Sequence, residues 1–280
     1  MNWFDLSKWY RLCLGLGLCL LPFLSMPVDQ ALAKDRQDAE LELTDEQAND
    51  LAMFVLGNTL FTLYHESGHM LVSELQLPIM GQEEDAVDNL ATVSMLASDT
   101  PQMDEYLVMA MLGWFALAAE SYDEMVFYGE HDLDQQRGYQ TLCLMVGADE
   151  QFNDLASDLG LPDDRIDSCI YEYELAADSW EAVTADVVRP EGEKGNKISV
   201  VYEPAPEDLK EIADLFQESG LLEQVAGEMD DTFELPETIT YKAQSCDEMN
   251  AFWDPEAREM IMCYELMALF ATVFVEELME

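Results

Sequence analysis

Positive charge is scarce in this sequence. Its 280 residues include 12 Lys and Arg against 59 Asp and Glu, which gives a formal net charge of −47. A surface this negative repels phosphate backbones and anionic lipid headgroups, so neither nucleic acid nor an anionic membrane is an expected partner. The acidic residues are spread along the chain, and we interpret most of them as a solvated surface.

Long apolar stretches are confined to the N-terminus. Lys8 and Arg11 precede an apolar run over residues 12–24, and Ala31-Leu32-Ala33 has the small-x-small pattern of a cleavage site. This pattern predicts a signal peptide over residues 1–33, cut after Ala33, and a periplasmic or secreted protein with no stable membrane span after cleavage. An uncleaved N-terminal anchor is the alternative.

The sequence has no CxxC spacing, which argues against a structural zinc site built on thiolates. Four cysteines follow the predicted signal peptide, and an even number in an exported chain favours disulfides. Three pairings are possible. We expect Cys143–Cys169 and Cys246–Cys263, because each pair lies within one local module.

The remaining chain predicts an α+β fold that is mostly helical, with a small sheet. We expect a helical core over residues 34–188, a linker over 189–196 that is rich in Pro, Gly and charge, and a C-terminal α/β module over 197–280 that packs on the core. An independent second domain is the alternative for that module. Residues 34–43 are interpreted as a charged leader.

Individual elements follow from apolar periodicity and turn residues. A capping box of Thr44 and Gln47 predicts the start of a long helix that ends near Leu75. Further helices are expected over 83–97, 103–120, 134–147, 164–185, 206–219 and 221–233, and another from about residue 264. Strands are expected over 197–202, 237–243 and 258–263, the last two joined by the turn at Asp254-Pro255.

Histidine is rarer still. Two of only three histidines form His65-Glu66-Ser67-Gly68-His69, an HExxH motif in the middle of the first predicted helix. Positions i and i+4 share one helix face, so both imidazoles can bind one zinc ion. Glu66 then lies where it can activate a zinc-bound water. Gly68 leaves room for a close neighbour, such as an edge strand or the substrate backbone.

A catalytic zinc ion needs a third protein ligand. Residues 83–88 resemble the glutamate helix of gluzincin metallopeptidases, in which ExxxD supplies a zinc-binding Glu and a supporting Asp. Glu84 and Asp88 match that spacing, so the resemblance implies Glu84 as ligand and Asp88 as hydrogen-bond partner of a ligand histidine. The alternative is that these acids only cap a helix, which is our interpretation of Glu83.

The third histidine, His131, lies in a polar loop before a predicted helix. A catalytic role, holding the oxyanion of a tetrahedral intermediate, is our prediction for His131, with Arg137 or Tyr139 as alternative sources of that support. His131 could instead be the third zinc ligand or a surface residue.

Taken together, residues 63–71, 77–88, 130–137 and 246–265 resemble an uncharacterised bacterial family of metallopeptidases, a domain of unknown function. The resemblance implies a zincin-like fold with one zinc ion. In that family the module containing residues 250–252 and 263–265 precedes the HExxH helix, whereas here it follows, as in a circular permutant. The C-terminal strands would then supply the edge strand that zincins use to bind extended substrate.

The sequence therefore predicts an exported, gluzincin-like zinc metallohydrolase acting on a peptide or protein substrate. Two alternatives stay open. One is a non-catalytic binding or assembly protein that keeps the zincin fold. The other is a zinc hydrolase of non-peptide substrates.

Overall fold

The computed structural model describes residues 43–120, 127–190 and 192–278, and Thr44–Glu280 forms one compact unit. The predicted signal peptide and most of the predicted charged leader lie outside the described residues. Within the described part, no helix is long and apolar enough to cross a membrane.

Helices make up most of the unit, so the prediction of a mostly helical α+β fold is confirmed. The α-helices are α2 (Asp45–Leu75), α3 (Glu83–Ala97), α4 (Pro101–Glu120), α5 (Asp134–Ala148), α6 (Asn153–Asp158), α7 (Asp163–Thr184), α8 (Lys210–Ser219), α9 (Leu221–Thr232) and α10 (Tyr264–Val273). Single turns of tighter or wider helix cover Glu150–Phe152, Glu207–Leu209 and Phe274–Leu278. The capping box of Thr44 and Gln47 opens α2 as predicted.

Four strands form one mixed sheet in the order β1-β2-β4-β3. They are β1 (Ile198–Tyr202), β2 (Ile239–Gln244), β3 (Ala251–Asp254) and β4 (Glu259–Cys263). Strands β1, β2 and β4 lie side by side and run parallel, and β3 pairs antiparallel with β4. The prediction that a turn at Asp254-Pro255 joins β2 to β4 was wrong, because an additional strand, β3, lies between them and that turn joins β3 to β4.

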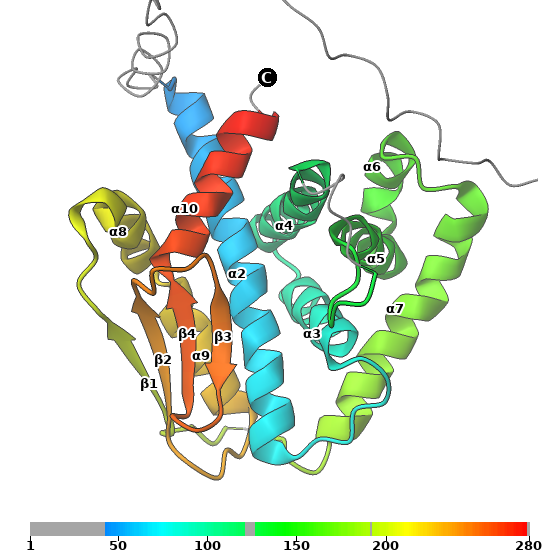
Figure 1. Cartoon of the computed structure of the whole chain (residues 1–280). Helices are drawn as coiled ribbons and strands as arrows, with labels where there is room; N and C mark the ends of the chain where they lie inside the picture. Colours follow the sequence, from blue (N-terminus) through cyan, green and yellow to red (C-terminus); the bar gives the residue numbers. More distant parts are fainter. Residues whose placement is uncertain (1–42, 121–126, 191, 279–280) are drawn as a thin grey trace, which may run out of the picture. The chain divides into compact units, whose positions relative to one another are not determined.

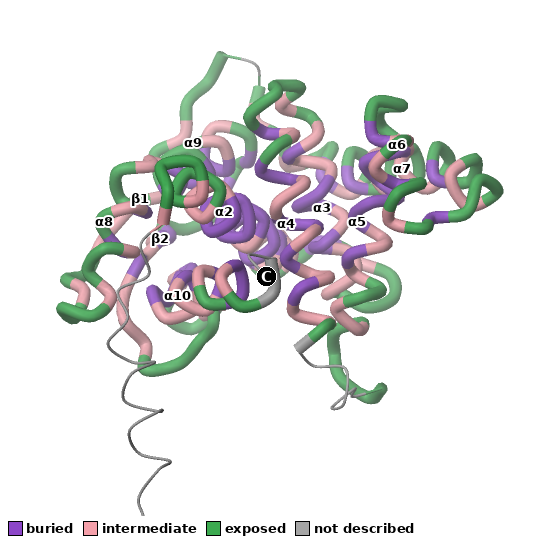
Figure 2. Tube along the Cα trace, turned by 90° about the horizontal axis from the view of Figure 1, so that it is seen from above, coloured by how far each residue is buried: buried purple, intermediate pink, exposed green. Residues whose placement is uncertain are grey.

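Helix α2 runs through the middle of the unit. The sheet with α8, α9 and α10 lies on one side of it, and α3, α4, α5 and α7 lie on the other (Figure 1). Side chains of α2 are buried almost all round the helix from Phe54 to Leu71, which Figure 2 shows as a continuous purple stretch. A helix buried on every face belongs in the interior, and this one joins the two halves of the core.

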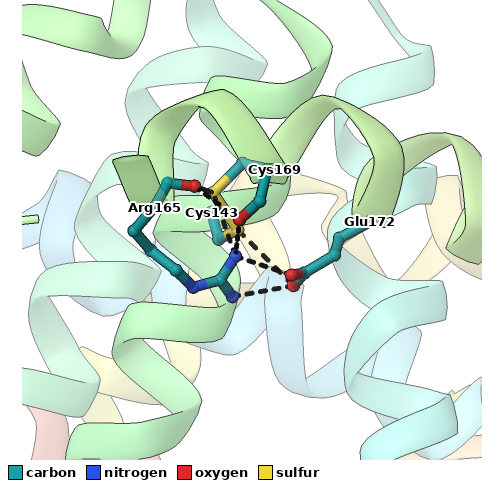
Figure 3. The surroundings of a disulfide bond; sticks show 5 residues. Cys143, Arg165, Cys169 and Glu172 are labelled. Atoms are coloured by element: carbon teal, nitrogen blue, oxygen red, sulfur yellow. Dashed lines mark hydrogen bonds and ion pairs between the residues drawn. A yellow bond between two sulfur atoms is a disulfide. The ribbon is translucent and has the colours of Figure 1, made fainter. Parts of the chain in front are cut away.

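Both predicted disulfides are present. Cys143–Cys169 joins α5 to α7, and Cys246–Cys263 joins the loop before β3 to the end of β4. Beside the first disulfide, Arg165 makes a bidentate ion pair with Glu172, in which the two guanidinium nitrogens lie 2.6 and 2.7 Å from the carboxylate oxygens (Figure 3). Glu265, in the first turn of α10, accepts hydrogen bonds from the backbone N–H groups of Cys246 and Asp247 beside the second disulfide.

The segment predicted to be a linker is tied to the end of α9. The backbone N–H of Arg189 donates to the carbonyl of Thr232, and the Arg189 guanidinium donates to the carbonyls of Asp230 and Phe233. The Asp230 carboxylate accepts from the backbone of Lys197 at the start of β1. These contacts fix the chain between the helical half and the sheet.

Candidate metal centre

The HExxH motif lies in the buried part of α2, where its side chains face α3 and the loop before α5. The Nε2 atoms of His65 and His69 are 3.2 Å apart. Oε2 of Glu84, on the first turn of α3, lies 3.3 Å from each of these nitrogens. Zinc bonds of about 2.0–2.1 Å in a tetrahedron place any two ligand atoms about 3.3 Å apart. The three atoms therefore have the spacing that one tetrahedral ion requires.

Carboxylates hold both imidazoles by their other ring nitrogen. Nδ1 of His65 lies 2.7 Å from Oδ1 of Asp88, and Nδ1 of His69 lies 2.8 Å from Oε1 of Glu83. A carboxylate accepts hydrogen bonds, so each Nδ1 carries the donated proton and each Nε2 can offer a lone pair to an ion. The interpretation of Glu83 as only a helix cap was wrong, since its side chain orients His69.

Asp88 is itself held by Arg137, on the first turn of α5. The Arg137 guanidinium donates to Oδ2 of Asp88 at 2.7 Å and to Oδ1 at 2.8 Å, and it stacks 3.6 Å above the centre of the Trp114 ring. The guanidinium is thus committed to Asp88 and Trp114. Its structural role is to position the carboxylate that orients His65.

Tyr139 points away from the histidines. Its hydroxyl donates to the carbonyl of Leu159, and its ring packs edge-on against Phe115 at 4.9 Å. The structure therefore does not place Tyr139 where it could support an oxyanion, contrary to the prediction. The period of α5 is the reason, because Arg137 and Tyr139 lie two residues apart and face different neighbours.

His131 does reach the centre. Its Nε2 lies 2.9 Å from Oε2 of Glu84, and its ring is nearly parallel to that of His65, with centroids 6.2 Å apart. His65, Glu84 and His131 each offer one atom within 4.8 Å of the others. Among the predicted residues, the structure thus brings His65, His69, Glu84 and His131 together.

Glu66 lines the same cleft without approaching the ligands as closely. Its Oε1 is 3.9 Å from Nε2 of His65. A backbone hydrogen bond from Trp253 on β3 reaches its carboxylate. The sequence identified Glu66 but not this contact. The partner is a main-chain group about 190 positions away, on strand β3, which was not predicted.

Burial and charge oppose each other at these groups. Burial raises the pKa of Glu66, and the neighbouring histidines only partly offset that effect. Burial lowers the pKa of His65, but hydrogen bonds to Asp88 and Glu84 outweigh it and raise the pKa to about 9. Burial of Glu84 is likewise outweighed by the three imidazoles, which hold the pKa of this carboxyl well below its usual range. These shifts favour an ionised Glu84 beside positive charge, which the protonated imidazole of His65 supplies.

The cleft over this centre has a volume of about 590 Å³. The histidines, Glu66 and Glu84 line one part of it, and residues 250–253 at the edge of the sheet line another. Oε2 of Glu84 is buried with no hydrogen-bond partner of normal geometry among the described residues, although three imidazole nitrogens surround it. An oxygen left in that state, with nitrogen and oxygen donors at tetrahedral spacing, fits a bound divalent metal ion.

Comparison with known proteins agrees with this arrangement. A family model described as "DUF4344: Putative metallopeptidase" matches residues 24–183 and 202–280, which is most of the chain. The chain belongs to this metallopeptidase family. No curated protein matches the sequence, and no solved structure matches it either. The two matched segments contain every residue of the candidate centre and the edge strand β3, and family membership suggests a metallohydrolase.

Proposed function

We propose that this member of the family is an exported zinc-dependent peptidase in which His65, His69 and Glu84 hold the ion. The observation that carries the proposal is the mutual spacing of their ligand atoms, 3.2–3.3 Å, with Glu66 beside them in an open cleft. A gluzincin-type ligand set is our assignment of these residues. The bound ion would supply Lewis-acid chemistry, lowering the pKa of water and polarising a carbonyl.

Glu66 is the general base in this proposal. Its carboxylate accepts a proton from the attacking water and then donates it to the leaving amine. The hydrogen bond from Trp253 fixes one side of the carboxylate, and the side chain is largely buried at the wall of the cleft. Asp88 and Glu83 hold the two histidines in the tautomer that the ion needs.

Strand β3 supplies a surface for an extended peptide. It is the last strand of the sheet and packs against α2, and residues 250–253 border the cleft. A peptide that adds to this edge gains backbone hydrogen bonds and comes to lie across the ligand histidines. This geometry supports a peptide over a non-peptide substrate.

Export, the domain division and the permuted module order belong to the same proposal. Two disulfides suit a non-cytoplasmic compartment. We propose that residues 1–33 direct export to the periplasm or beyond.

We further propose that residues 34–188 and 197–280 are the permuted parts of one metallopeptidase fold, joined at 189–196. The packing of β3 against α2 supports the second part of this proposal, because the two segments build one cleft.

The decisive experiment compares wild-type protein with Glu66→Gln and His65→Ala. We expect about one zinc per chain in wild type and Glu66→Gln, and little in His65→Ala, by elemental mass spectrometry. Wild type alone should cleave a library of unstructured peptides, with a loss of at least about 100-fold in Glu66→Gln. Zinc in both proteins with full function in Glu66→Gln would favour a binding protein, and a wild type that takes up no zinc would overturn the proposal.

A further inference from the structure

His131 approaches the centre from a different direction than the other donors. It lies on the segment that precedes α5, outside any helix or strand, whereas His65 and His69 are on α2 and Glu84 is on α3. Its Nε2 is nevertheless the nearest imidazole nitrogen to Oε2 of Glu84, at 2.9 Å against 3.3 Å for the other two. Two helices and one loop thus bring four donor side chains together around Oε2 of Glu84.

Three imidazoles crowd one oxygen of Glu84. Its Oε2 is buried beneath the three imidazoles, without a hydrogen bond of normal geometry from any of them among the described residues. A catalytic zinc site normally keeps its fourth position open for water, whereas a site with four protein ligands is closed. His131 lies against the same Glu84 oxygen as the two HExxH histidines, so its Nε2 is close enough to serve as a fourth donor.

We propose that His131 is a fourth protein ligand, which closes the metal centre in the resting protein and leaves it when substrate enters. This inference rests on the proposed zinc site and adds a gate to it. It assigns His131 a role different from the oxyanion support predicted from the sequence.

The structure makes His131 the one of the three histidines that can leave. Its side chain is 49% exposed, against 7% for His65 and 17% for His69. His65 and His69 are each anchored through Nδ1 to a carboxylate, but within the described ranges no such anchor holds the other ring nitrogen of His131. A ligand without such an anchor binds more weakly and exchanges more readily.

The loop is fixed just beyond His131, which keeps the ring within reach. Arg137 ties the start of α5 to Asp88 of α3 and to Trp114 of α4. Gln136 and Leu133 close the first turn of α5 by a side-chain and a backbone hydrogen bond. A rotation of the short segment before Leu133 would therefore open the site without moving α5.

The test counts imidazole ligands in the zinc-loaded protein by X-ray absorption spectroscopy. We expect three in wild type and two in His131→Ala, with three in the control variant Glu130→Ala from the same exposed loop. Chelator competition should show zinc affinity falling by at least about tenfold in His131→Ala. In the cobalt-loaded proteins, azide should change the visible spectrum of His131→Ala and leave that of wild type unchanged.

A second variant separates ligation from a simple contact with Glu84. His131→Gln keeps a hydrogen-bond donor near that carboxylate but no imidazole, so it should resemble His131→Ala in ligand count and azide response. Restoration of wild-type zinc affinity by Gln would overturn the inference. A wild-type count of two imidazoles with zinc bound would also overturn it and leave the proposed function standing, whereas no zinc uptake would remove both.

Discussion

The Asp88 carboxylate accepts three hydrogen bonds beside the candidate centre. Its Oδ1 takes both Nδ1 of His65 and one Arg137 nitrogen, and its Oδ2 takes a second Arg137 nitrogen, all within 2.8 Å. The side chain is buried. Burial acts to raise its pKa, but the hydrogen bonds from His65 and Arg137 outweigh it and lower the pKa below the usual value. Asp88 is therefore ionised and fixes the orientation and tautomer of His65.

We expect Asp88→Asn to weaken zinc binding by roughly 10–100-fold, the range for loss of a carboxylate behind a metal-bound histidine. The amide has no negative charge and replaces one of the two acceptor oxygens with an NH2 donor, so the hold on the Nδ1 proton of His65 and on the Arg137 guanidinium weakens. Chelator competition measures the affinity. The matched control is Asp85→Asn, one turn away on α3, which should bind zinc like wild type because among the described residues Asp85 makes no hydrogen bond or ion pair with either histidine. Equal affinity in Asp88→Asn and wild type would show that Asp88 serves packing alone.

At the residue scale, the sequence predicted what helical spacing determines. His65 and His69 had to share a face, and Glu84 and Asp88 had to lie one turn apart on α3. The side chain that would orient His69 was not predictable, because Glu83 and Glu84 are neighbours and only the approach of α3 to α2 decides which histidine each meets. The pairing of Arg137 with Asp88 spans 49 positions and depends on how α5 meets α3, which no local pattern records.

Helices α2 and α3 pack unusually closely at Gly68. A Cβ built there would lie 2.7 Å from Cγ1 and 2.8 Å from Cβ of Val87, closer than side chains tolerate. The close neighbour predicted for Gly68 is thus α3, not an edge strand or substrate. This contact sets the distance at which Glu84 and Asp88, on either side of Val87, can reach His65.

Gly68→Ala should push α3 away from α2, because one side is a helix backbone and the other a β-branched side chain with little freedom. We expect a stability loss of about 1–3 kcal/mol, the usual cost of overpacking, together with weaker zinc binding. Thermal unfolding measures the first and chelator competition the second.

Gly227→Ala on α9 is the control for the substitution itself. Nothing lies within 4 Å of the Cβ position at Gly227, so alanine there should leave zinc binding unchanged. It should raise the free energy of unfolding by up to about 1 kcal/mol, because alanine has the higher helix propensity. If Gly68→Ala behaved like Gly227→Ala, the close packing of α2 on α3 would not set the metal geometry.

At the element scale, most helices and three of the four strands were predicted within a few residues, but α6, β3 and the pairing of the strands were not. Helix α3 was predicted with the bounds that it has, since acidic residues at its start and apolar periodicity mark it locally. Strand β3 has only four residues, too few to show alternation. The parallel pairing of β2 with β4 depends on contacts between distant segments, whereas sequence proximity favoured a hairpin.

The whole molecule carries a charge imbalance that its ion pairs do not offset. With 12 basic and 59 acidic residues, most carboxylates have no cationic side chain to pair with. Some of the cations that do pair are held by buried carboxylates, as Arg137 is by Asp88 and Arg258 by Glu74. Self-repulsion at neutral pH therefore opposes the compact state more than the unfolded chain, in which the same charges lie farther apart.

Salt should consequently stabilise this protein. Raising NaCl from about 0.01 M to 0.15 M shortens the Debye length from about 30 Å to 8 Å and screens carboxylates on opposite sides of the unit. Each 1 kcal/mol recovered raises the Tm by roughly 2–4 °C in a unit of this size, so we expect a rise of several degrees in a thermal unfolding series at pH 7. Repeating the series near the sequence pI of about 4.1 is the control, because the net charge there is close to zero and salt has little repulsion left to screen. A Tm that stayed constant with salt at pH 7 would mean that bound cations already neutralise the acidic surface, and a Tm that fell would mean that attractive ion pairs outweigh the repulsion between the acidic residues.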